Sequence, residues 1–336
     1  MKSPSQTFFL LALLNSLVGA TATVSNDTGG LVFDYPYPVQ FFNVASQQNP
    51  LSQLSMAYMD ISPAVAQPKE TIVLLHGKNF CGATWNQTID VLLTSGYRVI
   101  APDQIGFCKS SKPTTYQFSL SQLALNTNSL LHSLGIFNAT IIGHSMGGML
   151  SARYALMFPS QTNRLVMVNP LGLENWFALG VPYQAIDITY QTELSTSFSS
   201  IKSYQQATYY AGTWDPSYDI WANMLLSVYK GSRGTEFAYD QALVTDMVFT
   251  QPVIAELPNL KMRSLLVIGD KDNTAIGKAW APADVKPLLG HYEVLGKQVS
   301  ARIPNCTLVE FAELGHAPQI QDPNTFHEAI LGWLSK

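Results

Sequence analysis

The chain has 336 residues, of which 47% are hydrophobic and 12% are charged, and its formal net charge is −4. This is enough chain for one large domain or two smaller ones with a substantial core. Because the few charged residues form no basic patch, arm or stripe, nucleic-acid binding is excluded.

Residues 1–22 have the pattern of a secretory signal peptide. Lys2 precedes an apolar run at 8–14, and the small residues that follow offer a cleavage point after Ala20 or Ala22. The apolar run is too short to favour a permanent membrane anchor, and no later segment spans a bilayer. We therefore predict a secreted protein without a stable membrane anchor.

Four N-glycosylation sequons fit a eukaryotic secretory route. They begin at Asn26, Asn86, Asn138 and Asn305. Asn26 lies in a polar segment and Asn305 in a turn before a predicted strand, so these two are the favoured acceptors. Asn138 abuts a predicted strand and is expected to be less accessible.

The cysteines Cys81, Cys108 and Cys306 leave one thiol unpaired if a disulfide forms. In an oxidising compartment Cys81 and Cys108 are the favoured pair, because both follow strands that are predicted to lie side by side. The alternative is three buried thiols.

Strands and helices alternate along most of the chain. Strand patterns occur at residues 39–44, 54–61, 71–75, 98–101, 139–142, 164–168, 263–268 and 307–311. Helical patterns occur at 84–94, 120–134, 149–156 and 323–334. The continuous apolar runs at 71–75 and 98–101 are typical of strands buried on both faces. The alternation predicts an α/β fold with a mostly parallel, doubly wound sheet.

The alternation stops between residues 173 and 257, a segment rich in Tyr, Trp, Gln and Ser with no convincing strand. We predict an inserted helical cap there, which divides the core into residues 23–172 and 258–336. Aromatic residues of this segment either line an apolar substrate pocket between cap and sheet or pack within the cap. They include Trp176, Phe177, Trp214, Trp221 and Tyr229.

The most informative motif is Gly143-His144-Ser145-Met146-Gly147, which has the pattern G-x-S-x-G between a predicted strand and a predicted helix. A sharp turn there places Ser145 at the apex, and the glycines let strand and helix approach closely. The competing interpretation is an ordinary buried serine in a tight turn.

A serine hydroxyl becomes a strong nucleophile only with a base in reach and an acid to orient that base. Asp272 follows the predicted strand 263–268, and His316 follows the strand 307–311. Both would lie with Ser145 at the carboxyl ends of parallel strands. Asp270 and Glu174 are alternatives for the acid, although we expect Asp270 to bind loop amides instead.

Three further residues are expected to serve the structure. We expect His144 to pack beneath the serine turn, His76 to order its loop, and Asp103 to organise the turn after its strand.

These motifs together resemble the α/β-hydrolase family, in its cap-bearing branch of carboxylesterases, carbon–carbon bond hydrolases, haloperoxidases and epoxide hydrolases. Besides the serine motif, the resemblance rests on segments 74–77, 103–107, 269–272, 315–316 and 321–323. It covers nearly all of the chain after the predicted signal peptide, and it is specific for fold and mechanism rather than for substrate.

The resemblance implies an oxyanion hole formed by the backbone N–H groups of Lys78 and Met146, with Asn79 as a neighbour whose side chain assists. Relatives often have glycine where this chain has Cys108. A serine nucleophile argues against epoxide hydrolysis and dehalogenation, because those branches need an aspartate at that position.

No metal-ligand spacing and no phosphate-binding or dinucleotide-binding fingerprint occurs in the sequence, so no cofactor or metal is implied. We predict a cofactor-independent Ser-His-Asp hydrolase that acts on an ester of an apolar small molecule. The alternative is a ligand-binding or non-hydrolytic protein of the same fold, with lyase-like or cyclase-like chemistry. The sequence gives no indication of oligomeric state.

Overall fold

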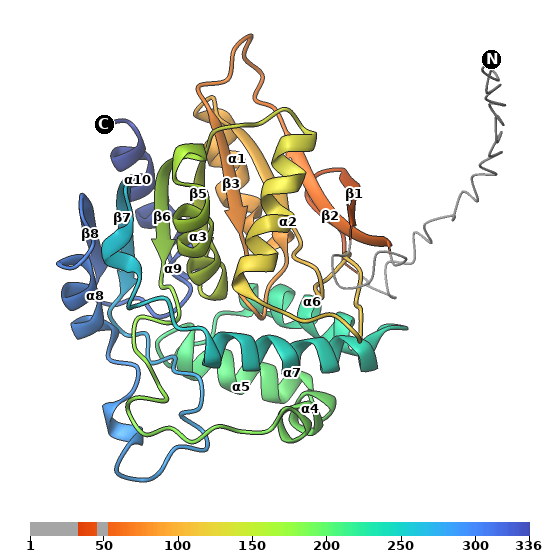
Figure 1. Cartoon of the computed structure of the whole chain (residues 1–336), viewed down its shortest axis with the longest axis vertical. Helices are drawn as coiled ribbons and strands as arrows, with labels where there is room; N and C mark the ends of the chain where they lie inside the picture. The colour runs from red at the N-terminus through yellow and green to blue at the C-terminus, as the bar shows by residue number, and fades with distance from the viewer. Residues whose placement is uncertain (1–32, 46–52) are drawn as a thin grey trace, which may run out of the picture.

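The computed structural model describes residues 33–45 and 53–336. Its centre is an eight-stranded sheet in the order β1-β2-β4-β3-β5-β6-β7-β8 (Figure 1). The strands are β1 (Val39–Ala45), β2 (Gln53–Ile61), β3 (Thr71–Leu75), β4 (Arg98–Pro102), β5 (Ala139–His144), β6 (Thr162–Val168), β7 (Arg263–Gly269) and β8 (Cys306–Phe311). The β1–β2 and β2–β4 pairs are antiparallel and the remaining pairs are parallel, which confirms the predicted fold class.

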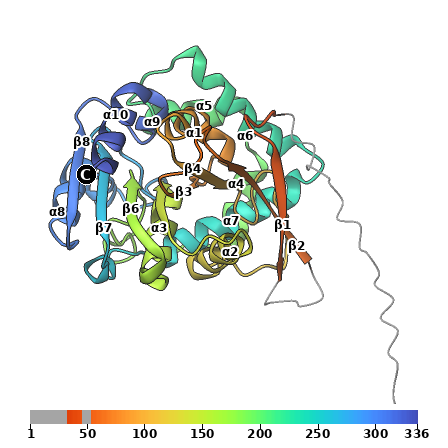
Figure 2. The ribbon, with the colours of Figure 1, turned by 90° about the horizontal axis from the view of Figure 1, so that it is seen from above.

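Helices cover both faces of the sheet (Figure 2). They are α1 (Asn86–Thr94), α2 (Leu120–Ser133), α3 (Met146–Met157), α8 (Tyr292–Ser300), α9 (Pro318–Gln321) and α10 (Pro323–Leu334). Successive side chains of β3 enter different cores, because neighbouring residues of a strand point to opposite faces. Leu74 belongs to the core that contains Ile89 of α1 and Trp333 of α10, and Leu75 to the core that contains Leu150 of α3.

Helix α8 is one of two core helices that the sequence pattern does not predict, the other being the short helix α9. Helix α8 contains Gly296, which lowers intrinsic helix propensity. A Cβ atom at Gly296 would lie 2.9 Å from Cγ1 of Ile268, so the glycine allows this helix to approach β7 closely. Tertiary packing therefore outweighs local propensity here.

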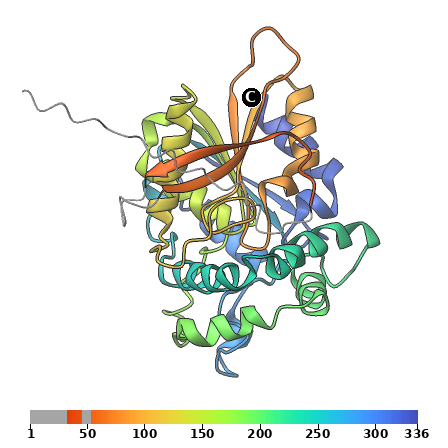
Figure 3. The same ribbon diagram turned by 90° about the vertical axis from the view of Figure 1, so that its right-hand side faces the viewer.

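The chain between β6 and β7 forms four α-helices and, within the described residues, no strand. They are α4 (Ile186–Leu194), α5 (Phe198–Thr208), α6 (Asp219–Lys230) and α7 (Gly234–Thr250). These helices lie across the end of the sheet to which the strand arrows of β3, β5 and β6 point (Figures 1 and 3). This is the end at which the polar residues singled out in the sequence also lie.

The predicted signal peptide and the sequon at Asn26 lie outside the described residues. Within the described part of the chain, no helix is both long enough and apolar enough to cross a bilayer.

Candidate active site

Ser145 occupies a strained turn between β5 and α3. Its φ of 59° and ψ of −121° lie in a region that non-glycine residues rarely adopt. The flanking glycines are required, since a Cβ atom at Gly143 would collide with the carbonyl of Gly147, and one at Gly147 with the carbonyl of Leu75. The local sequence therefore folds into the sharp strand-to-helix turn that its pattern predicts.

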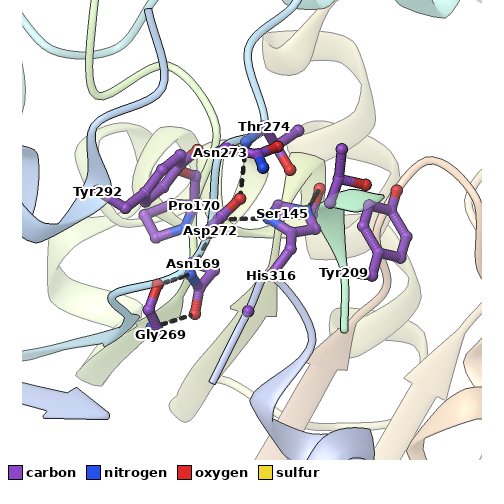
Figure 4. Close-up of polar contacts among 12 residues, drawn as sticks. Ser145, Asn169, Pro170, Tyr209, Gly269, Asp272, Asn273, Thr274, Tyr292 and His316 are labelled. Atoms are coloured by element: carbon purple, nitrogen blue, oxygen red, sulfur yellow. Dashed lines mark hydrogen bonds and ion pairs between the residues drawn. The ribbon is translucent and has the colours of Figure 1, made fainter. Parts of the chain in front are cut away.

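Ser145, His316 and Asp272 form one chain of hydrogen bonds (Figure 4). Oγ of Ser145 lies 2.8 Å from Nε2 of His316, and Nδ1 of His316 lies 2.6 Å from Oδ2 of Asp272. All three residues are buried. The turns after β5, β7 and β8 bring them together because these strands run parallel and end at the same edge of the sheet.

Asp272 is held by two further residues that the sequence pattern does not identify. Its Oδ1 accepts a hydrogen bond of 2.8 Å from the Thr274 amide, and its Oδ2 accepts one of 2.9 Å from Nδ2 of Asn169. Asn169 also accepts a hydrogen bond from the Gly269 amide and adopts a left-handed φ of 39° (Figure 4). Its position directly after β6, parallel to β7, was the only sequence signal that could have pointed to it.

The two alternative acids lie elsewhere. Oε1 of Glu174 accepts hydrogen bonds from Nε1 of Trp176 and from the Gly290 amide, and burial raises the pKa of this carboxyl. The expectation that Asp270 binds loop amides is wrong. Among the described residues its buried Oδ1 has no hydrogen-bond partner, and partial burial raises the pKa of Asp270.

His144 lies directly beneath His316. Its Nε2 is 2.7 Å from the carbonyl oxygen of His316, and the two ring centroids are 4.9 Å apart. Burial holds the pKa of His144 well below its usual value, so the neutral ring donates its Nε2–H to that carbonyl. His144 therefore packs under the turn, as expected.

His76 and Asp103 order the neighbouring loops, also as expected. Nδ1 of His76 lies 2.9 Å from the carbonyl oxygen of Gly77, while its Nε2 accepts a 3.0 Å hydrogen bond from the Gln104 amide. The Asp103 carboxylate accepts hydrogen bonds from the amides of Gly82 and Lys109.

The loop after β3 passes over Ser145. A Cβ atom at Gly77 would lie 2.9 Å from Cβ of Ser145, so glycine permits this approach. The next residue is Lys78, whose backbone N–H, like that of Met146 at the start of α3, donates to no acceptor among the described residues. The side chain of Asn79 instead donates a 2.9 Å hydrogen bond to the hydroxyl of Tyr209.

A disulfide between Cys81 and Cys108 joins the loop after β3 to the loop after β4, which confirms the predicted pairing. Cys108 adopts a φ of 41°, in the region that favours glycine. This conformation explains why relatives often have glycine at the position of Cys108. Cys306 is a free, half-buried thiol.

A cavity of about 290 Å³ lies between the loop after β3 and the helices α4–α6. Lys78, Glu193 and Gln205 are among the polar residues that line it, and Leu225 and Ile276 are among the apolar ones.

Of the five aromatic residues that the sequence suggests for a pocket, Tyr229 lines this cavity. Three of the others pack against neighbouring rings: Trp176 against Phe249, Trp214 against Tyr210 and Tyr218, and Trp221 against Phe33. Phe177 is 67% exposed. Packing, rather than a pocket lining, therefore describes Trp176, Trp214 and Trp221.

A mostly parallel eight-stranded sheet, with a serine on the turn after β5 and a histidine after β8, defines a hydrolase of the α/β class. A family model for the alpha/beta hydrolase fold matches residues 70–323, which is most of the chain. The chain belongs to the α/β-hydrolase family.

Among solved structures, the chain is similar to a probable hydrolytic enzyme of Pseudomonas aeruginosa PAO1. The sequences are 56% identical, with a TM-score of 0.88 over 90% of this chain and 96% of the other. The chain is 28% identical over 260 residues to Lipase 3 of Moraxella sp. (strain TA144), which covers 75% of this chain and 73% of that protein. It is 24% identical over 286 residues to a 2-hydroxy-6-oxo-6-phenylhexa-2,4-dienoate hydrolase of Burkholderia cepacia, at 79% and 88% coverage.

Proposed function

We propose that the protein is a secreted serine hydrolase that cleaves carboxylic esters through an acyl-enzyme intermediate. The observation that carries this proposal is the buried hydrogen-bonded chain from Ser145 through His316 to Asp272. Its geometry suits a nucleophile, a general base and an orienting acid, since both links are within hydrogen-bond reach.

In the first half of the reaction, Oγ of Ser145 attacks the ester carbonyl carbon while Nε2 of His316 takes the hydroxyl proton. Asp272 stabilises the imidazolium that forms. The backbone N–H groups of Lys78 and Met146 hydrogen-bond the oxyanion, which fits their having no other acceptor among the described residues.

Collapse of the tetrahedral intermediate breaks the bond to the alcohol oxygen, which receives the proton from His316. In the second half, His316 takes a proton from water, and the resulting hydroxide attacks the acyl carbon. Breakage of the acyl–Oγ bond then returns that proton to Ser145 and releases the carboxylic acid.

The proposal is tested with a fluorophosphonate probe, which forms a phosphorus–oxygen bond to an activated serine with loss of fluoride, and with nitrophenyl esters of increasing acyl length. Ser145→Ala should abolish labelling and lower kcat by about 10⁶-fold, because removal of a nucleophile disables the whole unit. Ser151→Ala is the matched control, since Ser151 lies on α3 and bonds the Gly148 carbonyl. Unchanged ester turnover in Ser145→Ala would exclude this function.

Secretion and glycosylation are part of the proposal and have their own test. Asn305 and Thr307 of the last sequon are both exposed, whereas the threonines of the sequons at Asn86 and Asn138 are buried. We expect secreted protein from a eukaryotic host to begin near residue 21 or 23 and to lose mass on N-glycosidase treatment. An unprocessed N-terminus on retained protein would contradict the proposed localisation.

A further inference from the structure

We propose that the 290 Å³ cavity selects esters whose acyl chain carries a neutral amide or hydroxyl group, and that Gln205 recognises this group. The inference rests on the proposed function, because it specifies the acyl side of the same site.

The cavity lies next to the loop that passes over the reactive serine. Lys78 and Asn79, which follow the glycine that covers Ser145, form part of the cavity wall. Asn79 also holds the hydroxyl of Tyr209, and the ring centroid of Tyr209 lies 4.7 Å from that of His316. In this proposal, an acyl chain bound to Ser145 extends past this loop into the cavity.

Among the described residues that line the cavity, Gln205 is the one whose buried side-chain amide lacks hydrogen-bond partners. It lies on α5, is 0% exposed and lines the cavity. Both polar atoms of its side chain, Nε2 and Oε1, are buried without a partner among the described residues. Buried amides are nearly always hydrogen-bonded, so a donor and an acceptor are available here for a molecule in the cavity.

The backbone fixes where this amide lies. The carbonyl oxygen of Gln205 accepts hydrogen bonds from the amides of Tyr209 and Tyr210, at 2.7 Å and 3.1 Å. The following loop also contacts the histidine turn, because the Ala317 amide donates a 3.3 Å hydrogen bond to the carbonyl of Tyr209. Gln205 is thus held at a set position relative to His316 rather than on a loose surface helix.

The charged residues of the cavity already satisfy one another. Nζ of Lys78 lies 2.7 Å from Oε1 of Glu193, and the hydroxyl of Tyr229 donates to Oε2 of the same carboxylate. The pair adds no net charge and leaves no unpaired cation among the described residues that line the cavity, so a substrate carboxylate would lose its hydration without gaining a charged partner. This arrangement disfavours acidic acyl groups.

The remaining walls set the rest of the preference. Ile201, Leu225 and Ile276 supply apolar surface for methylene groups. A plain hydrocarbon chain would fill this space but leave the Gln205 amide unpaired, whereas an amide in the chain both donates and accepts. The cavity is therefore matched to an amphipathic acyl chain, which revises the expectation of a purely apolar substrate.

The test compares three nitrophenyl esters of equal chain length: hexanoate, N-acetyl-β-alaninate and the hemi-ester of adipate. Wild-type protein should show the highest kcat/KM for the amide ester and the lowest for the acidic one. Gln205→Met, which keeps the side-chain volume, should lower kcat/KM for the amide ester by about tenfold. It should not lower kcat/KM for hexanoate, because the hydrocarbon chain then leaves no buried amide unpaired. Gln206→Met is the matched control on the same helix, since Gln206 bonds the Gly212 carbonyl.

Equal loss with both neutral esters in Gln205→Met would assign Gln205 a structural role and overturn the inference. A wild-type preference for hexanoate or for the acidic ester would also overturn it, and this comparison needs no variant to fold. If no ester is hydrolysed and the fluorophosphonate does not label Ser145, the proposed function fails and the inference with it.

Discussion

Two neighbouring aspartates, Asp270 and Asp272, have different surroundings at the same end of β7. Asp272 is buried and contacts His316, while Asp270 is partly buried without a partner for its Oδ1 among the described residues. We expect Asp272→Asn to lower kcat by about 10⁴-fold, because the amide would favour the wrong tautomer of His316. Asp270→Asn is the matched control and should leave kcat close to the wild-type value. Measurement of kcat for ester hydrolysis in both variants tests this. A severe loss of kcat in Asp270→Asn would refute the assignment of Asp272 as the acid that orients His316.

The order of the residues in the sequence identified Ser145, Asp272 and His316 as candidates, because each follows a recognisable strand. It could not identify Asn169, Thr274 or Gln205. Their roles depend on hydrogen bonds, or on missing ones, between segments that are far apart in the chain. For Lys78 the sequence indicates only a backbone N–H in the oxyanion hole. Its side chain also forms an ion pair with Glu193 in the cavity.

Asp240 of α7 is a buried carboxyl outside the site. Neither of its oxygens has a hydrogen-bond partner in the described part of the chain, and burial raises its pKa to about 8. The folded protein therefore keeps this proton between pH 4 and 8, where the unfolded chain releases it. Stability from this residue is complete at low pH and is lost as the pH rises toward 8.

We expect Asp240→Asn to raise the Tm, and we expect the gain over wild type to grow between pH 5 and pH 8. The neutral amide never has to be ionised in its buried position, so its stability does not fall with pH in the same way. Thermal unfolding across this pH range measures the effect, with Asp187→Asn on the exposed surface of α4 as control. A gain that is independent of pH would contradict the assignment.

At the scale of elements, the core strands and most core helices follow from the sequence because their apolar periodicity agrees with their burial. The sequence does not predict α8 or the short α9, and α8 is a helix whose glycine is needed for contact with Ile268. The inserted helices are recognisable from the sequence as helical, but periodicity cannot say which of their side chains face a cavity. Trp214 and Tyr229 have equivalent sequence signals, yet only Tyr229 lines the cavity described here.

The loop after β3 and the loop after β4 are joined by the Cys81–Cys108 disulfide, which spans a sequence separation of 27 residues. Loss of the bridge in Cys81→Ala should lower the free energy of unfolding by about 2–4 kcal/mol. Cys108→Ala loses the same bridge and keeps a side chain at a φ of 41°. Cys108→Gly should be more stable than Cys108→Ala by about 1 kcal/mol, because glycine adopts this conformation without strain. Urea unfolding measures the order, and an alanine variant at least as stable as the glycine variant would contradict it.

At the scale of the whole molecule, the inserted helices and the sheet share one apolar core. Leu75 and Met149 from the sheet layers belong to the same buried cluster as Trp221, Met224 and Phe237 from the insertion. We therefore expect one cooperative unfolding transition, with equal calorimetric and van't Hoff enthalpies. Two separable transitions in calorimetry, or tryptophan fluorescence that changes before circular dichroism, would show that the insertion unfolds independently.

The free thiol of Cys306 allows opening of one edge of the sheet to be measured in solution by thiol alkylation. With the disulfide intact it is the one thiol of the chain, and it lies at the start of β8, one of the two edge strands of the sheet. Burial raises its pKa to about 11, so the unreactive protonated form prevails at neutral pH while the strand stays in place. We therefore expect alkylation of this thiol to be slow in the folded protein and faster when β8 opens locally, without an introduced label. Because the turn that carries His316 directly follows β8, the same alkylation rate also reports local opening of the backbone next to that turn.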